Sequence, residues 1–319
     1  MKSVLFTPAG SELAVTGIRA LADCADVRTV STDIARLAPG LHLADRGYLV
    51  PEFEDDAYMT AILDIVERED IDVVVPVLDQ ILKPFAAARE QVRARGAAVM
   101  ISPLETLDVT RDKWQTYQRL SGVVPLPDSW IAKPPLPEDG DLFVKPRTGS
   151  GSEDIHRITS QAELDFYHEQ MEQPIIQEYL PGTEYTIDCL TDRDGDLIAC
   201  VPRERKELTG GVSTQVTVVE REDLFSLARG VAGELDFVGP FFIQAKLDED
   251  GVPRLTEIGA RLAGTMCAGF ASPSLQYAGI AQLCGESVPD PTVNFGTHMS
   301  RHWAEMYPDD ELERLHEWP

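Results

Sequence analysis

The sequence predicts an α/β protein, with a parallel sheet in its N-terminal part and an α+β arrangement in its C-terminal part. Two patterns support this prediction. Over residues 1 to about 104, short β-branched runs alternate with amphipathic stretches, as expected for parallel strands joined by crossover helices. From Asp141 onward, alternating apolar and polar runs meet at turn dipeptides such as Asp194-Gly195 and Asp250-Gly251, which predict antiparallel hairpins.

The clearest strand of the N-terminal part is the run IDVVVPV, because a near-continuous apolar run is typical of a strand that is buried on both faces. Gly96 suits the end of a helix, since glycine readily adopts the left-handed conformation found there. In chain order we expect a strand Val4–Thr7, a helix Glu12–Leu21, a strand Val27–Ser31, a helix Tyr58–Arg68, a strand Ile71–Val77, a helix Ile81–Arg95 and a strand Ala97–Ile101.

A proline-rich stretch, Val124–Pro137, interrupts the pattern in the middle of the chain. Its five prolines exclude a regular helix and predict a semi-rigid connection. Around it we expect a helix Thr110–Leu120, a strand Leu142–Lys145, a helix Gln161–Met171, strands Pro174–Leu180 and Glu184–Thr191, and a helix Glu222–Leu235.

The composition excludes several classes of function. Lysine and arginine total 28 against 54 acids, and the resulting formal charge of −26 suits neither a nucleic-acid backbone nor an anionic membrane surface. Five scattered cysteines without a C-x-x-C pair disfavour a disulfide framework or a zinc ribbon. With neither a signal peptide nor a membrane span visible, we expect a cytoplasmic protein. The acid-rich, lysine-poor composition is also typical of proteins from a salt-rich cytoplasm.

The first motif with chemical content is the segment from Phe143 to Ser152. A strand delivers Lys145, and a glycine-serine loop follows at once; such a loop lets backbone N–H groups close over phosphates while the lysine neutralises them. It is not a Walker loop, because no G-K-[ST] ends it. In a chain with only seven lysines, Lys145 and Arg147 beside this loop favour phosphate binding over an ordinary connection.

The second motif is the strand end at Glu178, Tyr179 and Leu180, followed by Glu184. Backbone groups at such a strand end can pair with an adenine edge, while the two apolar side chains pack on its face. Glu184 can accept hydrogen bonds from ribose hydroxyls. A plain hairpin with surface acids is the alternative.

The third motif is a hairpin around Asp250-Gly251 that would place Gln244 opposite Glu257. Two oxygen ligands on paired strands suit Mg²⁺, which otherwise keeps water and phosphate ligands. Arg261 follows at the strand end and can bind a carboxylate or a phosphoryl group. The alternative is an ordinary sheet without a site.

The fourth motif is the basic cluster VPRERK, residues 201–206, beside the flexible pair Gly210-Gly211. A solvated run of charges is the usual explanation of such a cluster. Its position between the second and third motifs favours an inward role, with Arg203 and Lys206 as the candidate residues.

The ordered set of motifs resembles the ATP-grasp superfamily, most closely stand-alone ligases similar to one ATP-binding half of the carbamoyl-phosphate synthetase large subunit. The resemblance covers nearly the whole chain and includes phrases such as Tyr48-Leu-Val-Pro, Arg111-Asp-Lys113 and Phe143-Val-Lys-Pro-Arg. It implies a Rossmann-like pre-ATP-grasp domain at residues 1–104, a small ATP-grasp lobe at 105–180 and a large lobe with the metal and substrate site at 181–319.

The resemblance also implies roles for individual residues. ATP and Mg²⁺, which Mn²⁺ can replace, are the implied cofactors, and a homodimer is the family-level expectation. The implied phosphate-binding set is Lys113, Lys145, Arg147, Gly149, Ser150, Gly151 and Ser152; Glu178, Tyr179 and Leu180 would hold adenine, Glu184 the ribose, and Gln244 and Glu257 the metal, while Arg203, Lys206 and Arg261 would act on the transferred phosphate and the substrate carboxylate.

The chain departs from the family pattern at three places. Gly259 stands where many members have an asparagine ligand, Gln244 is neutral where others are acidic, and Asp79-Gln80 replaces a more acidic pattern.

The resemblance implies an ATP-dependent ligase that joins a small carboxylate to an amine through an acyl phosphate and releases ADP and phosphate. Two alternatives within the fold are a bicarbonate-dependent enzyme that forms carboxyphosphate and a non-catalytic ATP-binding protein, for which Gly259 is the best support. A dinucleotide-dependent oxidoreductase is disfavoured, because the first turn, TPAGS, lacks G-x-G-x-x-G.

Overall fold

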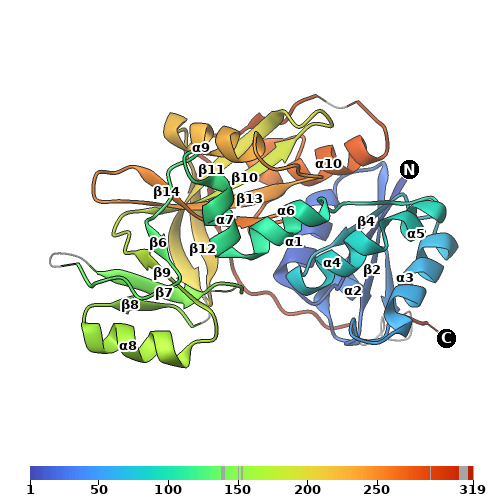
Figure 1. The fold of residues 1–319 in the computed structure, drawn as a ribbon. Helices are drawn as coiled ribbons and strands as arrows, with labels where there is room; N and C mark the ends of the chain where they lie inside the picture. The colour runs from blue at the N-terminus through green and yellow to red at the C-terminus, as the bar shows by residue number, and fades with distance from the viewer. Residues whose placement is uncertain (138–140, 150, 152–153, 288, 309–314, 319) are drawn as a thin grey trace.

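The structure is a computed structural model that describes residues 1–137, 141–149, 151, 154–287, 289–308 and 315–318. Its chain forms a parallel sheet flanked by helices, a small four-stranded sheet with one helix, and a large antiparallel sheet (Figure 1). The predicted α/β class is confirmed. The predicted domain boundaries near residues 104 and 180 stay predictions.

The parallel sheet has the strand order β18-β3-β2-β1-β4-β5, and every pair in it is parallel. Because the chain runs outward from β1 on both sides, the sheet has a switch point between β1 and β4, where ligands commonly bind. Its strands are β1 (Lys2–Thr7), β2 (Val27–Asp33), β3 (Arg46–Leu49), β4 (Val73–Pro76), β5 (Ala98–Val99) and β18 (His316–Glu317), with helices α1 (Glu12–Leu21), α2 (Pro39–Leu43), α3 (Ala57–Arg68), α4 (Asp79–Ala87) and α5 (Arg89–Ala94).

The sequence predicted the central strands and α1 of this sheet well, because their apolar runs are long. Three short elements were not predicted: α2, β3 and β18. The last of these comes from the far end of the chain and pairs with β3, where His316 lies opposite Tyr48 and their rings stack 5.1 Å apart. The predicted single helix over 81–95 is interrupted at Ala88, between α4 and α5.

The small sheet has the order β6-β9-β7-β8 and is antiparallel throughout. Helix α8 (Gln161–Gln170) packs on it through Leu164, which is fully buried among Leu142, Val144 and Ile158. The strands are β6 (Ser129–Trp130), β7 (Leu142–Pro146), β8 (His156–Ile158) and β9 (Pro174–Glu178). Strand β6 lies within the proline-rich stretch, which contains no helix, as predicted.

The large sheet has the order β14-β13-β10-β11-β12-β17, and the hairpins predicted at Asp194-Gly195 and Asp250-Gly251 join β10 to β11 and β13 to β14. Its strands are β10 (Glu184–Thr191), β11 (Leu197–Thr209), β12 (Val212–Val218), β13 (Phe241–Leu247), β14 (Pro253–Gly259) and β17 (His298–Ser300), with helices α9 (Glu222–Ala232) and α10 (Leu275–Leu283). Two further short strands, β15 (Ala271–Ser272) and β16 (Thr292–Val293), pair with each other. Among the described residues, no helix is long and apolar enough to cross a membrane.

The parallel sheet and the large sheet share a hydrophobic core. One continuous cluster of buried side chains contains Val4 and Phe6 of β1 together with Phe242 and Leu262 of the large sheet and the loop after it. Gly17 of α1 is part of this contact, because a Cβ atom there would lie 2.5 Å from the Phe6 ring. The two units are therefore packed against each other through apolar side chains, which fixes the groove between them.

The prediction of one helix over residues 110–120 is wrong at the start of that helix. The structure has two helices, α6 (Leu104–Arg111) and α7 (Lys113–Leu120), which are separated by Asp112 in an extended conformation. The Asp112 carboxylate accepts hydrogen bonds from the backbone N–H groups of Trp114 (2.9 Å) and Gln115 (3.3 Å), and so caps α7.

Asp112 also binds Arg147, which follows β7. The Arg147 Nε and Nη2 atoms each lie 2.6 Å from a carboxylate oxygen of Asp112. Burial alone would raise the pKa of Asp112, but the hydrogen bonds from Arg147 and from the start of α7 hold it below its usual value. One acid therefore fixes both the start of α7 and the end of β7.

We predict that Asp112→Ala lowers the free energy of unfolding by about 1–2 kcal/mol, because it removes a helix cap and the partner of Arg147. Urea denaturation measures this loss. Asp112→Asn retains a capping oxygen and should recover part of it. Asp108→Ala, which removes an exposed acid paired with Lys83, is the control and should change stability by less than about 0.5 kcal/mol. A loss in Asp112→Ala no larger than the control contradicts the capping role.

Candidate active site

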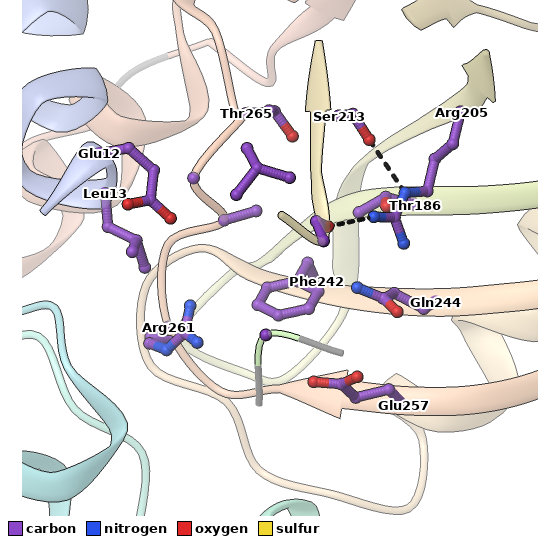
Figure 2. A pocket seen from close by; sticks show the side chains of 15 residues that line it. Glu12, Leu13, Thr186, Arg205, Ser213, Phe242, Gln244, Glu257, Arg261 and Thr265 are labelled. Atoms are coloured by element: carbon purple, nitrogen blue, oxygen red, sulfur yellow. Dashed lines mark hydrogen bonds between the residues drawn. The ribbon is translucent and has the colours of Figure 1, made fainter. Parts of the chain in front are cut away.

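Three adjoining grooves run along β14 and the loop that follows it, and Glu257 lines all three. We call them the central groove, the Asp79 groove and the inner groove. The central groove is lined by Glu12 and Leu13 of α1, Gly151, Thr186, Arg205, Gly211, Val212, Ser213, Phe242, Gln244, Glu257, Arg261, Ala263, Gly264 and Thr265 (Figure 2). The Asp79 groove adds Asp79, Gln80, Arg111, Lys113 and Gly149, and the inner groove adds Leu126, Pro127, Gln177 and Leu255.

Gln244 and Glu257 lie directly opposite each other on β13 and β14, as the predicted hairpin requires. Both side chains reach into the central groove (Figure 2). On the other side of Gln244, Thr186 of β10 is its register partner and lines the same groove. An amide oxygen and a carboxylate on neighbouring strands are hard oxygen donors, so this pair fits a magnesium ion chemically. Among the described residues, no group of three or more His, Cys, Asp or Glu side chains could hold a metal ion.

Lys145 is almost completely buried beside this pair, with 7% of its surface exposed. Its Nζ donates a hydrogen bond to the carbonyl oxygen of Thr256 at 3.2 Å. Burial lowers the pKa of Lys145 to about 7, and the charge of Lys113 lowers it further, while Glu257 and Glu184 act in the opposite direction. The cause is the cost of holding an ammonium group away from water. An anion close to the ammonium group would offset that cost.

Lys113 and the glycine loop lie next to each other at the rim of the Asp79 groove. The backbone N–H of Lys113 donates to the carbonyl oxygen of Arg147 at 3.0 Å, and its Nζ donates to the carbonyl oxygen of Gly149 at 3.1 Å. Gly149 and Gly151 have φ angles of +143° and +76°, a conformation that side chains rarely adopt. Glycine is therefore required at both positions. The predicted phosphate ligands Ser150 and Ser152 lie outside the described residues.

Arg261 is held by Asp79, the first residue of α4. The Arg261 Nε lies 2.9 Å from one carboxylate oxygen of Asp79, and Nη2 lies 2.7 Å from the other. Burial alone would raise the pKa of Asp79, but the charge of Arg261 and its hydrogen bonds hold it below the usual value. Its Nη1 donates to the carbonyl oxygen of Leu262 at 3.0 Å, and the guanidinium lies 5.4 Å from the centre of the Phe242 ring, so all three nitrogens of Arg261 have partners within the protein.

Arg205 is a groove residue to which the sequence gave no role of its own. Its Nε donates to the Ser213 Oγ at 2.9 Å, and its other nitrogens donate to Glu184 and to the carbonyl oxygen of Gly211. Glu184, the predicted ribose ligand, is thus already paired with an arginine in this structure. The signal for Arg205 was its period-two spacing from Arg203 along one strand, which places both arginines on the same face.

Of the predicted cationic residues, Lys145, Arg147, Arg203 and Lys206 line none of the three grooves. Arg203 is completely buried and makes a bidentate ion pair with Asp188, with both distances 2.7 Å, and donates to the Thr265 hydroxyl at 2.8 Å. Lys206 is exposed and lines none of the three grooves. Arg147 is bound to Asp112. In this geometry Arg203 and Arg147 serve the scaffold and Lys206 faces solvent, whereas Arg205 lines the central groove.

The predicted adenine-binding residues lie at the end of β9, of which Glu178 is the last residue. The backbone N–H of Glu178 donates to the carbonyl oxygen of Asp128 at 3.0 Å, and burial raises the pKa of its carboxyl group. Two cations lie close to the Tyr179 ring, with the Arg157 guanidinium 4.2 Å and the Lys246 Nζ 5.2 Å from its centroid. Leu180 is buried. None of the three lines the grooves described above.

The ring of Phe242 explains why position 259 is a glycine. Phe242 and Gly259 are register partners on β13 and β14. A Cβ atom on Gly259 would lie 2.1 Å from Cε1 of the Phe242 ring, which is far inside van der Waals contact. The ring therefore occupies the space that a side chain at position 259, such as asparagine, would need.

Comparison with protein families agrees with the fold. Residues 4–100 match the family described as PylC-like, N-terminal domain, and residues 170–304 match the family described as ATP-grasp in the biosynthetic pathway with Ter operon. Together the two matches span more than two thirds of the chain. No curated protein matches the sequence.

Solved structures with the same fold include several ATP-dependent enzymes. The biotin carboxylase domain of 2-oxoglutarate carboxylase from Hydrogenobacter thermophilus, in complex with MgADP, ADP and bicarbonate, is 15% identical with a TM-score of 0.71, over 93% of this chain and 73% of that one. N5-carboxyaminoimidazole synthetase from Staphylococcus aureus with ADP is 13% identical with a TM-score of 0.73, over 92% and 80%. N5-carboxyaminoimidazole ribonucleotide synthetase from Thermotoga maritima is 18% identical with a TM-score of 0.68, over 92% and 78%.

At these identities the structural likeness concerns the fold alone. It confirms a Rossmann-like N-terminal domain followed by a two-lobed ATP-grasp fold. The finer resemblance to carbamoyl-phosphate synthetase stays a prediction. The chain therefore has the ATP-grasp fold, and its residues 170–304 match an ATP-grasp family.

Proposed function

We propose that this protein is an ATP- and Mg²⁺-dependent ligase that joins a small carboxylate to an amine through an acyl phosphate. The single observation that carries the proposal is that cationic side chains and a pair of oxygen donors on β13 and β14 line adjoining grooves. Glu257 and Arg261 line both the central groove and the Asp79 groove, Gln244 lines the first and Lys113 the second. Lys145 is buried behind β14, where it donates to the carbonyl oxygen of Thr256. This combination suits the charge of a nucleotide triphosphate and of a carboxylate beside it.

The chemistry needs little covalent help from the protein. A carboxylate oxygen of the substrate attacks the γ-phosphorus of ATP, and the bond from that phosphorus to the bridging oxygen breaks to release ADP. The amine nitrogen then attacks the acyl carbon; the C–N bond forms, the C–O bond to phosphate breaks, and the ammonium loses a proton. Positioning and charge neutralisation supply most of the rate in phosphoryl transfer, which fits a site made of cations and oxygen donors.

Within this proposal the cations fall into two groups, one for the nucleotide and one for the substrate. Lys113 and Lys145 neutralise the nucleotide phosphates, and the loop with Gly149 and Gly151 supplies backbone N–H groups that cover them. Arg261 binds the substrate carboxylate and the transferred phosphoryl group. Arg205, which lines the central groove, assists it there in place of Arg203 and Lys206.

Tyr179 and Leu180 would hold the adenine ring of ATP, as the family resemblance implies. Glu178 and Glu184 complete the nucleoside contacts in this assignment. Glu184 is then oriented toward the ribose by its ion pair with Arg205, which ties nucleoside binding to the substrate groove.

Gln244 and Glu257 would hold the metal ion. Bound there, Mg²⁺ would supply positive charge to the phosphates. The ring of Phe242 fills the space of a third ligand at position 259, so Gln244 and Glu257 would be the two ligands that the protein supplies. This is the coordination that Mg²⁺ commonly adopts with nucleotides, and it does not require the asparagine of other members.

A bicarbonate acceptor is the second candidate. The observation that favours it is the bicarbonate anion bound with MgADP in the 2-oxoglutarate carboxylase domain, whose fold this chain shares. Bicarbonate would take the place of the carboxylate, and carboxyphosphate would be the intermediate.

A phosphate-release screen tests the proposal. We expect ADP and phosphate to appear only when MgATP meets one particular pair from a panel of small carboxylates, bicarbonate and amines, with mass spectrometry detecting the joined product. Glu257→Gln should lower kcat at least about 100-fold and shift the Mg²⁺ titration to higher concentration, because it removes the charged ligand. Glu249→Gln, on an exposed hairpin turn, is the matched control. ATP binding without turnover across the panel would favour a non-catalytic nucleotide-binding protein.

We predict that ATP binding takes up a proton at Lys145. The free protein holds the pKa of Lys145 at about 7, so at pH 8 only about a tenth of the molecules carry its charge. Nucleotide phosphates raise that pKa, so binding should take up about 0.9 proton at pH 8 and almost none at pH 6, and affinity should fall as pH rises above 7. Calorimetry in buffers of different ionisation enthalpy measures the uptake. Lys145→Met should abolish it, whereas Lys133→Met, at an exposed ion pair, should not. Equal uptake at both pH values contradicts the assignment.

We predict that Gly259→Asn lowers stability by about 2–3 kcal/mol, because the new side chain collides with the Phe242 ring. Adding Phe242→Ala opens the space, so the double variant should lose less stability than the sum of the two single variants. Thermal unfolding of the single and double variants measures the coupling between the two positions. Additive effects of the two substitutions would show that the ring does not exclude a side chain at position 259.

A further inference from the structure

A second cavity, of about 540 Å³, lies at the carboxyl ends of the parallel strands and shares no lining residue with the three grooves. Its walls come from four loops, those after β1, β2, β3 and β4, and from the start of α3. The lining residues are Pro8, Gly10, Ser11, Asp33, Ile34, Val50, Pro51, Glu52, Phe53, Glu54, Tyr58, Leu78 and Ile81. Ligands of parallel α/β sheets bind at this edge, beside the switch point of the strand order.

The walls of the cavity are mainly apolar. Val50, Leu78 and Ile81 form its inner side, while Ile34 and Phe53 stay 55% and 37% exposed although both are large hydrophobic side chains. The Tyr58 hydroxyl is hydrogen-bonded to the Thr7 hydroxyl at 2.7 Å. A cavity of this size and lining suits an organic molecule of one or two rings.

The charged groups that line the cavity are all acids: Asp33, Glu52 and Glu54. Asp33 is nearly buried and held in place, because one of its oxygens accepts from the Gly10 N–H at 2.7 Å and the other from the Ala35 N–H at 2.9 Å. Each carboxylate oxygen still has a second lone pair. The cavity is therefore an apolar chamber with a fixed negative charge and two acids at its exposed side.

These acids disfavour a dinucleotide, whose pyrophosphate group a Rossmann-like domain would otherwise be expected to bind. A pyrophosphate needs free backbone N–H groups at the turn after β1, but the Gly10 N–H is already bound by the Asp33 carboxylate. Three acids would also repel its charge. We therefore propose that the cavity is a binding site for an apolar organic amine, whose ring system fills the chamber and whose ammonium group faces Asp33, Glu52 and Glu54.

One segment of the chain, residues 10–13, lines both the cavity and the central groove. Gly10 and Ser11 line the cavity, and the next two residues, Glu12 and Leu13, line the groove. Because Gly10 is bonded to Asp33, a ligand that contacts Asp33 also contacts the anchor of this loop.

The experiment is isothermal titration calorimetry of the full chain, with tryptamine as the probe. We expect one molecule to bind with a Kd below about 1 mM, because a two-ring amine has about twelve non-hydrogen atoms to bury. Tryptophol lacks the ammonium group and indole-3-propionate reverses the charge, so both should bind at least about fivefold more weakly. Saturation with Mg²⁺ and a non-hydrolysable ATP analogue should leave tryptamine bound.

Two variants locate the site. Phe53→Ala removes an apolar wall, and Glu52→Gln with Glu54→Gln removes two of the charges; each should weaken tryptamine at least about fivefold without changing the affinity for the ATP analogue. Glu220→Gln with Glu249→Gln removes the same charge from exposed positions elsewhere and should leave tryptamine binding unchanged. Displacement of tryptamine by the ATP analogue, equal binding of the three probes, or an equal loss in the control variant would each overturn the proposal.

Discussion

The ion pair between Asp79 and Arg261 is the interaction on which the candidate active site depends. It joins Asp79, the first residue of α4, to Arg261, which follows two residues after β14, through hydrogen bonds of 2.9 and 2.7 Å. The two residues are 182 positions apart in the sequence. Both side chains are largely removed from water, so the loss of either would leave an uncompensated charge. Because Glu257 and Gly259 are on β14 and Arg261 follows two residues after its end, the Gln244–Glu257 pair and Arg261 share this anchor.

The site concentrates positive charge inside a strongly acidic protein. The net charge of −26 repels ATP and a carboxylate at long range, and salt screens that repulsion beyond about 8 Å. Close to β14 the charges are more evenly balanced, because Lys113, Arg205 and Arg261 line the grooves together with Glu12, Asp79 and Glu257, and Lys145 lies behind them. The free protein reduces the repulsion among the cations in two ways: acids pair with the arginines, and burial leaves Lys145 largely neutral above pH 7. A bound polyanion would then supply the charge that makes a protonated Lys145 stable.

Much of the fold and part of the site followed from short-range patterns. The Gln244–Glu257 pair was predictable because a tight turn and a period of two fix which residues meet across a hairpin. Helix α1 was predictable because its apolar spacing is regular over ten residues. Which basic residue lines the groove was not predictable, because the cluster around Arg203 contains three of them. Only the burial of Arg203 against Asp188 distinguishes it from Arg205, which lines the groove. The start of α7 was missed because its cap, Asp112, also binds a residue 35 positions away.

By itself the sequence determined the alternation of strands and helices, the hairpins, the glycine loop after Lys145 and the oxygen pair on β13 and β14, because neighbouring residues set these features. Tertiary structure alone decided which acid pairs with which cation, why glycine stands at position 259 and where the apolar cavity of the N-terminal domain lies. Each of these depends on side chains brought together from distant segments, such as Asp79 with Arg261 or Gly10 with Asp33. Such contacts form when the sheets pack against each other, and spacing along the chain carries no record of them.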